Sequence, residues 1–154
     1  MGTTHFTGLS AKKLYKNDIE ITPIATELNR GAIKKVTGAL AAVNTGGGLF
    51  SWANPESGSI IVEHVALVIT TKTTGACSAD VGTTATNATT LSDNMIDGKD
   101  INAAAGTFTS DESAGTNGKQ GRRVASGKWV TGSVVSGGAS AGIVGTYEIY
   151  YRVL

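Results

Sequence analysis

The sequence predicts an all-β protein: a jelly-roll-like antiparallel β-sandwich with an extended N-terminal arm. Three observations support this class. Segments rich in β-branched residues recur along the chain, turn signals separate them about every ten residues, and no stretch sustains a helical period. The 154 residues have the size of one ordinary domain. We expect the arm over residues 1–30 and the sandwich domain over residues 31–154.

Six segments have the character of strands. Residues 59–71 are rich in β-branched side chains and contain neither Gly nor Pro. Residues 146–154 alternate most regularly, so we expect Ile149 to face the core and Arg152 to face the other side. The remaining candidates are residues 33–43, 47–53, 76–83 and 128–136.

Turn chemistry separates these segments. The run Asn54-Pro55-Glu56-Ser57-Gly58 predicts a turn, because proline presets φ and glycine tolerates positive φ. Similar signals are Thr74-Gly75, Asp97-Gly98, Asn117-Gly118, Ser126-Gly127 and Gly137-Gly138. Little helix is expected, with a single turn over residues 92–96 as the candidate.

Composition excludes several classes of protein. Hydrophobic residues make up 40% and charged residues 16%, which is too apolar for a disordered chain. A formal net charge of +1 argues against a dedicated nucleic-acid binder, and no apolar run is long enough for a membrane span. The single cysteine, Cys77, excludes an internal disulfide framework, and we expect it to be a small buried residue.

Charge divides the chain into a basic start and an acidic remainder. Residues 1–45 hold six basic and three acidic residues, a net charge of +3, and the rest carries −2. An arm of this kind suits contact with an acidic partner surface. The predicted contact residues are Lys12, Lys13, Lys16, Arg30, Lys34 and Lys35.

No motif in the sequence completes a catalytic or metal site. Gly138-Ala139-Ser140-Ala141-Gly142 matches a nucleophile elbow, but both histidines, His5 and His64, lie upstream of it. Asp93, Asp97 and Asp100 are crowded, yet Met95 stands where an EF-hand needs a ligand. We therefore expect Asx turns there, with a calcium site as the alternative. No enzymatic activity, cofactor or metal is predicted.

Large aromatic and paired basic side chains supply candidates for contact with other molecules. Tryptophans suit core or interface packing, and the alternative is stacking against sugars. Adjacent arginines suit an interface ion pair, with a solvated charged face as the alternative. The predicted oligomer interface comprises Trp52, Arg122, Arg123, Trp129 and Tyr150.

An ordered set of motifs resembles the small capsid decoration, or cement, proteins of tailed bacteriophages. These motifs are LFSWANPESG at residues 49–58, SDNMIDG at 92–98, GTNGK at 115–119 and the aromatic C-terminal strand. The resemblance covers roughly residues 33–154. It implies a β-sandwich body and no catalytic residues.

The resemblance also implies a function and partners. It implies a virion structural protein made in the host cytoplasm, which binds the assembled shell of major capsid protein from outside and stabilises it. It further implies a homotrimer, with neither nucleic acid nor membrane as a direct partner. The alternative is a phage fibre-tip or carbohydrate-binding β-sandwich module, which Trp52, Trp129, Tyr150 and the aspartate cluster favour.

Overall fold

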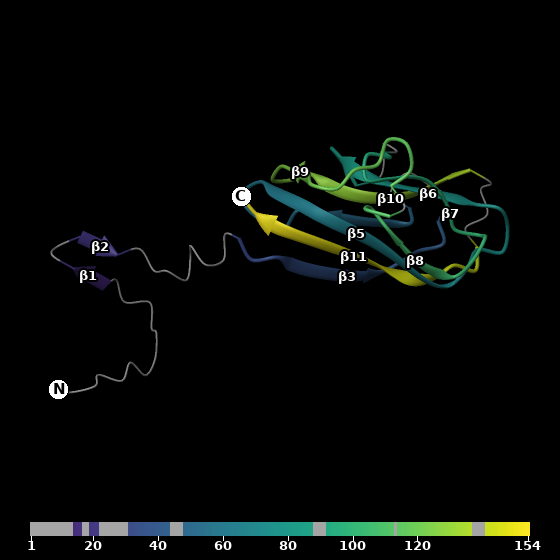
Figure 1. The fold of residues 1–154 in the computed structure, drawn as a ribbon, viewed down its shortest axis with the longest axis horizontal. Coiled ribbons are helices and arrows are strands. Elements are labelled where there is room, and N and C mark those ends of the chain that lie inside the picture. Colours follow the sequence, from purple (N-terminus) through teal and green to yellow (C-terminus); the bar gives the residue numbers. More distant parts are fainter. Residues whose placement is uncertain are drawn as a thin grey trace, which may run out of the picture.

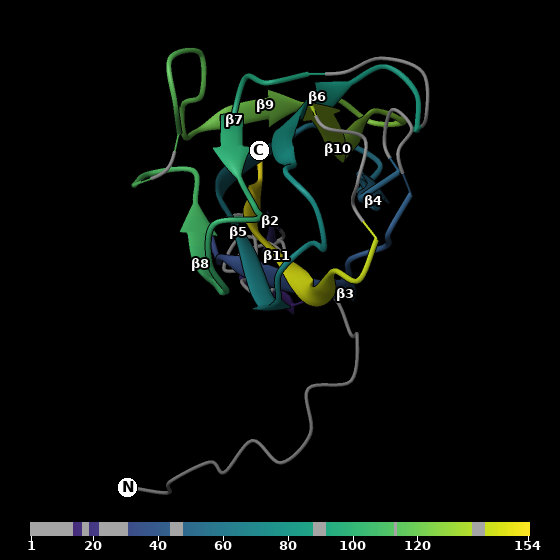
Figure 2. The same cartoon turned by 90° about the vertical axis from the view of Figure 1, so that its right-hand side faces the viewer.

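The computed structural model describes residues 14–16, 19–21, 31–43, 48–87, 92–112, 114–136 and 141–154. These residues form strands and loops without a helix, and two antiparallel sheets pack face to face. Figure 1 shows the sandwich from the side, and Figure 2 looks along its strands, with β6 and β10 above β3, β5 and β11. The predicted all-β sandwich is confirmed.

Each sheet combines strands from distant parts of the chain. One sheet contains, in order, β3 (Lys34–Ala39), β11 (Val144–Val153), β5 (Ile60–Thr71) and β8 (Gly106–Thr109), and β9 (Arg122–Val124) also pairs with β5. The other contains, in order, β4 (Phe50–Ala53), β10 (Trp129–Ser136), β6 (Ser78–Thr84) and β7 (Ile96–Asp100).

The strand pairs are nested, which identifies the topology as a jelly roll. With β9 set aside, β3 pairs with β11, β4 with β10, β5 with β8 and β6 with β7. The first strand of the sandwich therefore pairs with the last, the second with the second-last, and so on inward. This arrangement winds eight strands into two sheets, as jelly rolls do.

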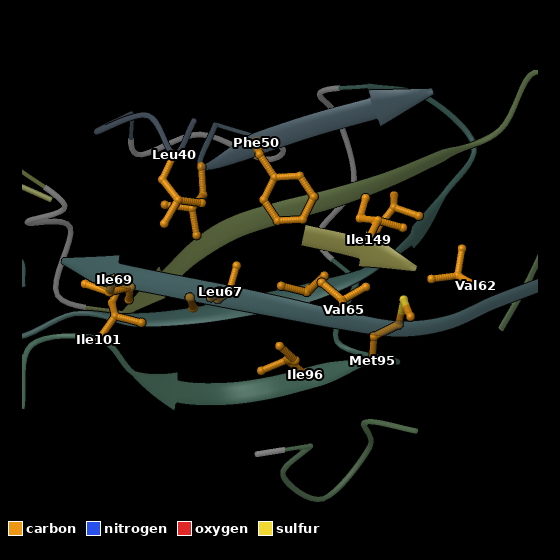
Figure 3. Close-up of a cluster of buried hydrophobic side chains, with 14 of the residues drawn as sticks. Leu40, Phe50, Val62, Val65, Leu67, Ile69, Met95, Ile96, Ile101 and Ile149 are labelled. Atoms are coloured by element: carbon orange, nitrogen blue, oxygen red, sulfur yellow. The ribbon is translucent and has the colours of Figure 1, made fainter. Parts of the chain in front are cut away.

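The core lies between the sheets and is lined by the inward faces of the longest strands. Ile149 of β11 and Leu67 of β5 are fully buried, and Figure 3 shows them beside Phe50 and Ile96 from the opposite sheet. The alternation predicted for the C-terminal strand is confirmed, because Ile149 and Tyr151 are buried while Arg152 is exposed. Cys77 belongs to the same buried cluster, as predicted.

Two aromatic rings stack across the sandwich, and each covers a glycine of its own sheet. Phe50 and Tyr147 have ring centroids 4.3 Å apart and an interplanar angle of 17°. Phe50 lies over Gly132, its partner on β10, and Tyr147 lies over Gly38, its partner on β3. A Cβ at Gly132 would stand 2.4 Å from the Phe50 ring, and one at Gly38 would stand 2.5 Å from the Tyr147 ring, so the stack requires glycine at both positions.

The structure differs from the sequence predictions in residues 92–96. The expected helical turn is wrong, because residues 94 and 95 form a bend and Ile96 begins β7. The Asn94 side chain bonds both the backbone N–H and the hydroxyl of Thr83, and the Met95 N–H donates to the Val81 carbonyl. These bonds to β6 replace the bonds that a helix would use.

Two further strands are described within the predicted arm. They are β1 (Leu14–Lys16) and β2 (Ile19–Ile21), which pair antiparallel as a two-stranded sheet of their own. Neither strand pairs with a strand of the sandwich.

Candidate functional site

A turn between β4 and β5 ties several elements together at one end of the sandwich. The side chain of Asn54 is buried, and its Nδ2 donates to the Gly58 carbonyl at 2.9 Å and to the Val124 carbonyl at 3.2 Å. Its Oδ1 accepts from the backbone N–H of Glu56 at 2.9 Å. The amide therefore fixes the turn and binds it to β9, which explains the asparagine of the NPESG motif.

The carboxylate of Glu56 extends this connection to the first and last strands of the sandwich. Its Oε1 lies 2.7 Å from Lys34 Nζ and accepts a hydrogen bond from the Tyr151 hydroxyl at 3.2 Å. The hydrogen bond from Lys34 lowers the pKa of Glu56, and the bond from Tyr151 lowers it further. Burial raises the pKa of the Tyr151 phenol, and Glu56 adds to that rise. At neutral pH Lys34 and Glu56 therefore form an ion pair.

Other contacts bring the C-terminal end of β11, and the segment that links β9 to β10, to the turn at residues 54–58. Leu154 N–H donates to the Ser59 carbonyl at 3.1 Å, and Arg123 donates to the Ser59 hydroxyl at 3.1 Å. The Ser126 hydroxyl donates to the Glu56 carbonyl at 3.3 Å. Figure 1 shows β9, the C-terminus and the start of β3 at this end. We call residues 31–34, 54–59, 123–128 and 154 the arm end.

A pocket of about 300 Å³ opens at the arm end, between the end of β6 and the turn that links β9 to β10. Val124 and Thr84 are its buried residues, and Arg123 and Lys128 are exposed. Within the described part of the chain, neither cation forms an ion pair. The lining residues are Thr83, Thr84, Ala85, Arg123, Val124, Ala125 and Lys128. The sequence analysis missed this pocket, because its walls come from distant segments.

The residues predicted to contact a partner through the arm fall into two groups. Lys34 and Lys35 lie on β3, where Lys34 pairs with Glu56 and Lys35 Nζ lies 2.8 Å from Glu148 Oε1. Both lysines are therefore already matched by intramolecular carboxylates. Lys16 belongs to β1, while Lys12, Lys13 and Arg30 lie outside the described residues, as do Ser140 and His5.

The residues predicted for an oligomer interface do not share one surface. Trp52 packs against the core, with its ring centroid 5.2 Å from that of Tyr151 in the opposite sheet. Tyr150 lies on β11 between Lys35, which approaches its ring, and His64. Trp129 is half-buried on β10, on the opposite face of its sheet from Trp52, because the core-facing Trp52 pairs with its neighbour Val130.

The two arginines of that set also point to different places. Arg122 Nε donates to the Asn94 carbonyl at 2.8 Å, which binds β9 to the loop before β7. Arg123 is exposed at the arm end, beside the pocket. The oligomer interface therefore stays a prediction. Of the five residues predicted for it, Arg123 lies at the arm end.

Three carboxylates meet on and beside β6. Oxygens of Asp80, Asp93 and Asp97 all lie within 4.8 Å of one another, and these groups could hold a divalent cation. Asp80 Oδ1 accepts from the Gly98 N–H at 2.7 Å. The side chain of Asn117 donates to Asp93 Oδ2 at 2.8 Å.

The acidic cluster differs from the one visible in the sequence. Asp80 from β6 replaces Asp100, which the sequence placed with Asp93 and Asp97. Asp100 Oδ1 instead accepts from the backbone N–H groups of Asn102 and Ala103, so the Asx turn predicted there is confirmed. The sequence signal that could have identified Asp80 is its position between two apolar residues of a strand, Ala79 and Val81, which are both buried.

Asp80→Asn is expected to raise the free energy of unfolding by about 1 kcal/mol near neutral pH. Burial raises the pKa of Asp80, and the charges of Asp97 and Asp93 raise it further, while the bond from Gly98 lowers it. Asparagine keeps an acceptor for Gly98 and removes the repulsion between carboxylates.

The sign of its pH dependence follows from the raised pKa. The folded state binds a proton at Asp80 more readily than the unfolded state does, so ionisation of Asp80 costs stability as pH rises above about 3.8. The stability advantage of Asp80→Asn should therefore grow as the pH rises from about 3.8 through the raised pKa of Asp80. At lower pH, where Asp80 is protonated in both states, the advantage should vanish. Thermal melts of both proteins across this range test the expectation. A variant less stable at neutral pH would contradict it.

Comparison with protein-family models, curated proteins and solved structures found no match to this chain. None of the described residues belongs to a helix long and apolar enough to cross a membrane.

Proposed function

We propose that this protein is a virion structural subunit, a capsid decoration or cement protein that binds the assembled shell of major capsid protein and stabilises it as a homotrimer. The observation that carries the proposal is the arm end, where a jelly-roll body continues into a basic N-terminal arm. Jelly rolls recur in viral capsid proteins as well as in lectins and cupins. Because one fold serves many functions, this surface and not the fold supports the proposed function.

The arm end offers contacts that suit a large partner surface. Exposed fractions are 65% for Ile33 and 51% for Leu154, and both residues lie where the arm joins the sandwich. Arg123 and Lys128 add positive charges without acidic partners among the described residues. Apolar groups beside unpaired charge are typical of a surface that a partner covers. An arm that gains contacts on binding extends such an interface.

Intramolecular ion pairs predict an order of importance among the basic residues. Glu56 and Glu148 already neutralise Lys34 and Lys35, so these lysines have less charge to offer a partner. Lys12, Lys13 and Lys16 of the arm should therefore contribute more to shell binding than the two lysines of β3.

Co-sedimentation with undecorated shells of the major capsid protein tests the proposal. The full chain should bind to saturation, and a chain lacking residues 1–30 should bind at least tenfold more weakly. The matched comparison replaces two arm lysines, Lys12 and Lys13, or the two β3 lysines by glutamine, and the arm variant should lose more affinity. Sedimentation equilibrium should show a trimer. Absence of saturable binding by the full chain at low salt would reject a shell-binding function.

One observation favours the alternative, a fibre-tip or carbohydrate-binding module. Trp129 is half-exposed, and aromatic rings of this kind stack on sugars. Trp52 and Tyr150, however, lie on other faces of the sandwich, so these three rings do not form one strip. A glycan array screened with and without calcium decides this alternative, and binding that Trp129→Ala abolishes would support it.

A further inference from the structure

We infer that the pocket between β6 and the turn that links β9 to β10 is a binding site for an acidic side chain of a partner protein, with Arg123 and Lys128 as its cationic residues. The inference deepens the proposed function and rests on it for the identity of the partner, which is the capsid shell. The pocket itself is described by the structure independently of that function.

Charge complementarity selects an anion as the ligand. Arg123 and Lys128 line the same pocket, both are exposed, and neither forms an ion pair with another described residue. The other cations of the arm end and its neighbouring strand, Lys34 and Lys35, are paired with Glu56 and Glu148. Positive charge is therefore available to a partner in the pocket, whereas on β3 it is already matched.

The walls of the pocket favour a carboxylate on a short aliphatic chain. Ala85, Val124 and Ala125 are apolar lining residues and can contact methylene groups. Thr83 and Thr84 add hydroxyl groups, and a guanidinium can bind a carboxylate through two parallel hydrogen bonds. No helix N-terminus lies in the described residues, so the pocket lacks the usual cradle for a phosphate. A glutamate side chain fits this combination.

Local bonds hold the cationic residues in place. The turn that links β9 to β10 is closed by a hydrogen bond from Lys128 N–H to the Ala125 carbonyl at 3.1 Å, with Gly127 at a φ of 71°. The Asn54 amide fixes the Val124 carbonyl, and Arg123 donates to Ser59. The two cations therefore extend from a backbone that is bound to the turn of the arm end. Such anchoring lowers the ordering cost of binding.

In the direct test, glutarate is titrated into the isolated protein at low salt, and its binding is monitored by two-dimensional amide NMR. Glutarate should shift the amides of residues 83–85, 123–125 and 128 to saturation at millimolar concentration. The double variant Arg123→Gln/Lys128→Gln should lose these shifts. The matched control Lys72→Gln/Lys119→Gln removes the same amount of charge at two exposed lysines away from the pocket. This control should show the same glutarate-induced shifts as the unmodified protein. Stronger shifts with inorganic phosphate, or no shifts at all, would overturn the inference.

The second test is shell co-sedimentation with the same three proteins. The pocket variant should bind shells at least tenfold more weakly than the control variant, while thermal melts show that both remain folded. Equal binding by the two variants would overturn the inference and leave the proposed function standing. If no protein binds shells, the proposed function fails, and the glutarate titration alone decides whether the pocket binds carboxylates.

Discussion

Ile149→Ala should lower the free energy of unfolding by about 2–5 kcal/mol, the range for a buried large-to-small substitution. Ile149 is fully buried at the centre of β11, between Val36 on β3 and Val65 on β5. Figure 3 shows its side chain among residues of the core. Removal of three carbons there leaves a cavity that neighbouring strands can fill only in part. Urea denaturation, with the midpoint and slope fitted separately, measures the loss.

Arg152→Ala is the control on the same strand. Arg152 Nε bonds Glu63 Oε1, and the arginine side chain is 45% exposed. Exposed pairs of this kind contribute about 0–1 kcal/mol, so this substitution should cost much less than the change at Ile149. A larger loss for Arg152→Ala would mean that the strand presents its other face to the core.

Asn54→Ala should lower the free energy of unfolding by about 2–4 kcal/mol, a large effect for a polar residue in a turn. The substitution removes three hydrogen bonds and leaves the carbonyl of Val124 without its side-chain donor in a buried position. It also releases β9 from the turn that carries Glu56. Denaturant melts measure the cost, and hydrogen exchange should show that protection falls first in β9.

Two further variants separate the roles of Asn54. Ser57→Ala changes an exposed residue of the same turn and should leave stability within about 0.5 kcal/mol. Asn54→Asp keeps the acceptor for the Glu56 N–H but replaces the donor by an oxygen that faces two carbonyls, so it should cost at least as much as alanine. Full stability of Asn54→Asp would show that the two donated bonds contribute nothing.

The sequence predicted the long strands well because their patterns are local. β5 and β11 carry runs of β-branched and aromatic residues, and the buried positions of β11 alternate. In β5 the buried positions change phase between Val62 and Val65, where the pairing with β11 has a register irregularity. β7, β8 and β9 were missed, because they are three to five residues long and contain glycine or charged side chains. Their extended form comes from pairing: β8 and β9 pair with the distant β5, and β7 pairs with β6, the strand that precedes it.

The same distinction applies to the candidate site. The turn at residues 54–58 was predictable, because proline, asparagine and glycine act within a few residues of one another. The ion pair of Glu56 with Lys34 joins residues 22 positions apart, and Asp80 reaches Asp93 and Asp97 through strand pairing. The pocket needs β6 and β9 to be neighbours. No local pattern encodes these proximities, so they require the topology.

The nested strand order also constrains the sequence of events in folding. β11 lies between β3 and β5, so these two strands cannot share a sheet until residues 144–153 have been synthesised and inserted between them. During synthesis from the N-terminus, β3 therefore waits longest for its partner, and both strands expose unpaired edges meanwhile. Pairing between such distant segments closes a long loop and slows folding. An unpaired strand edge of this kind favours aggregation for as long as β11 is missing.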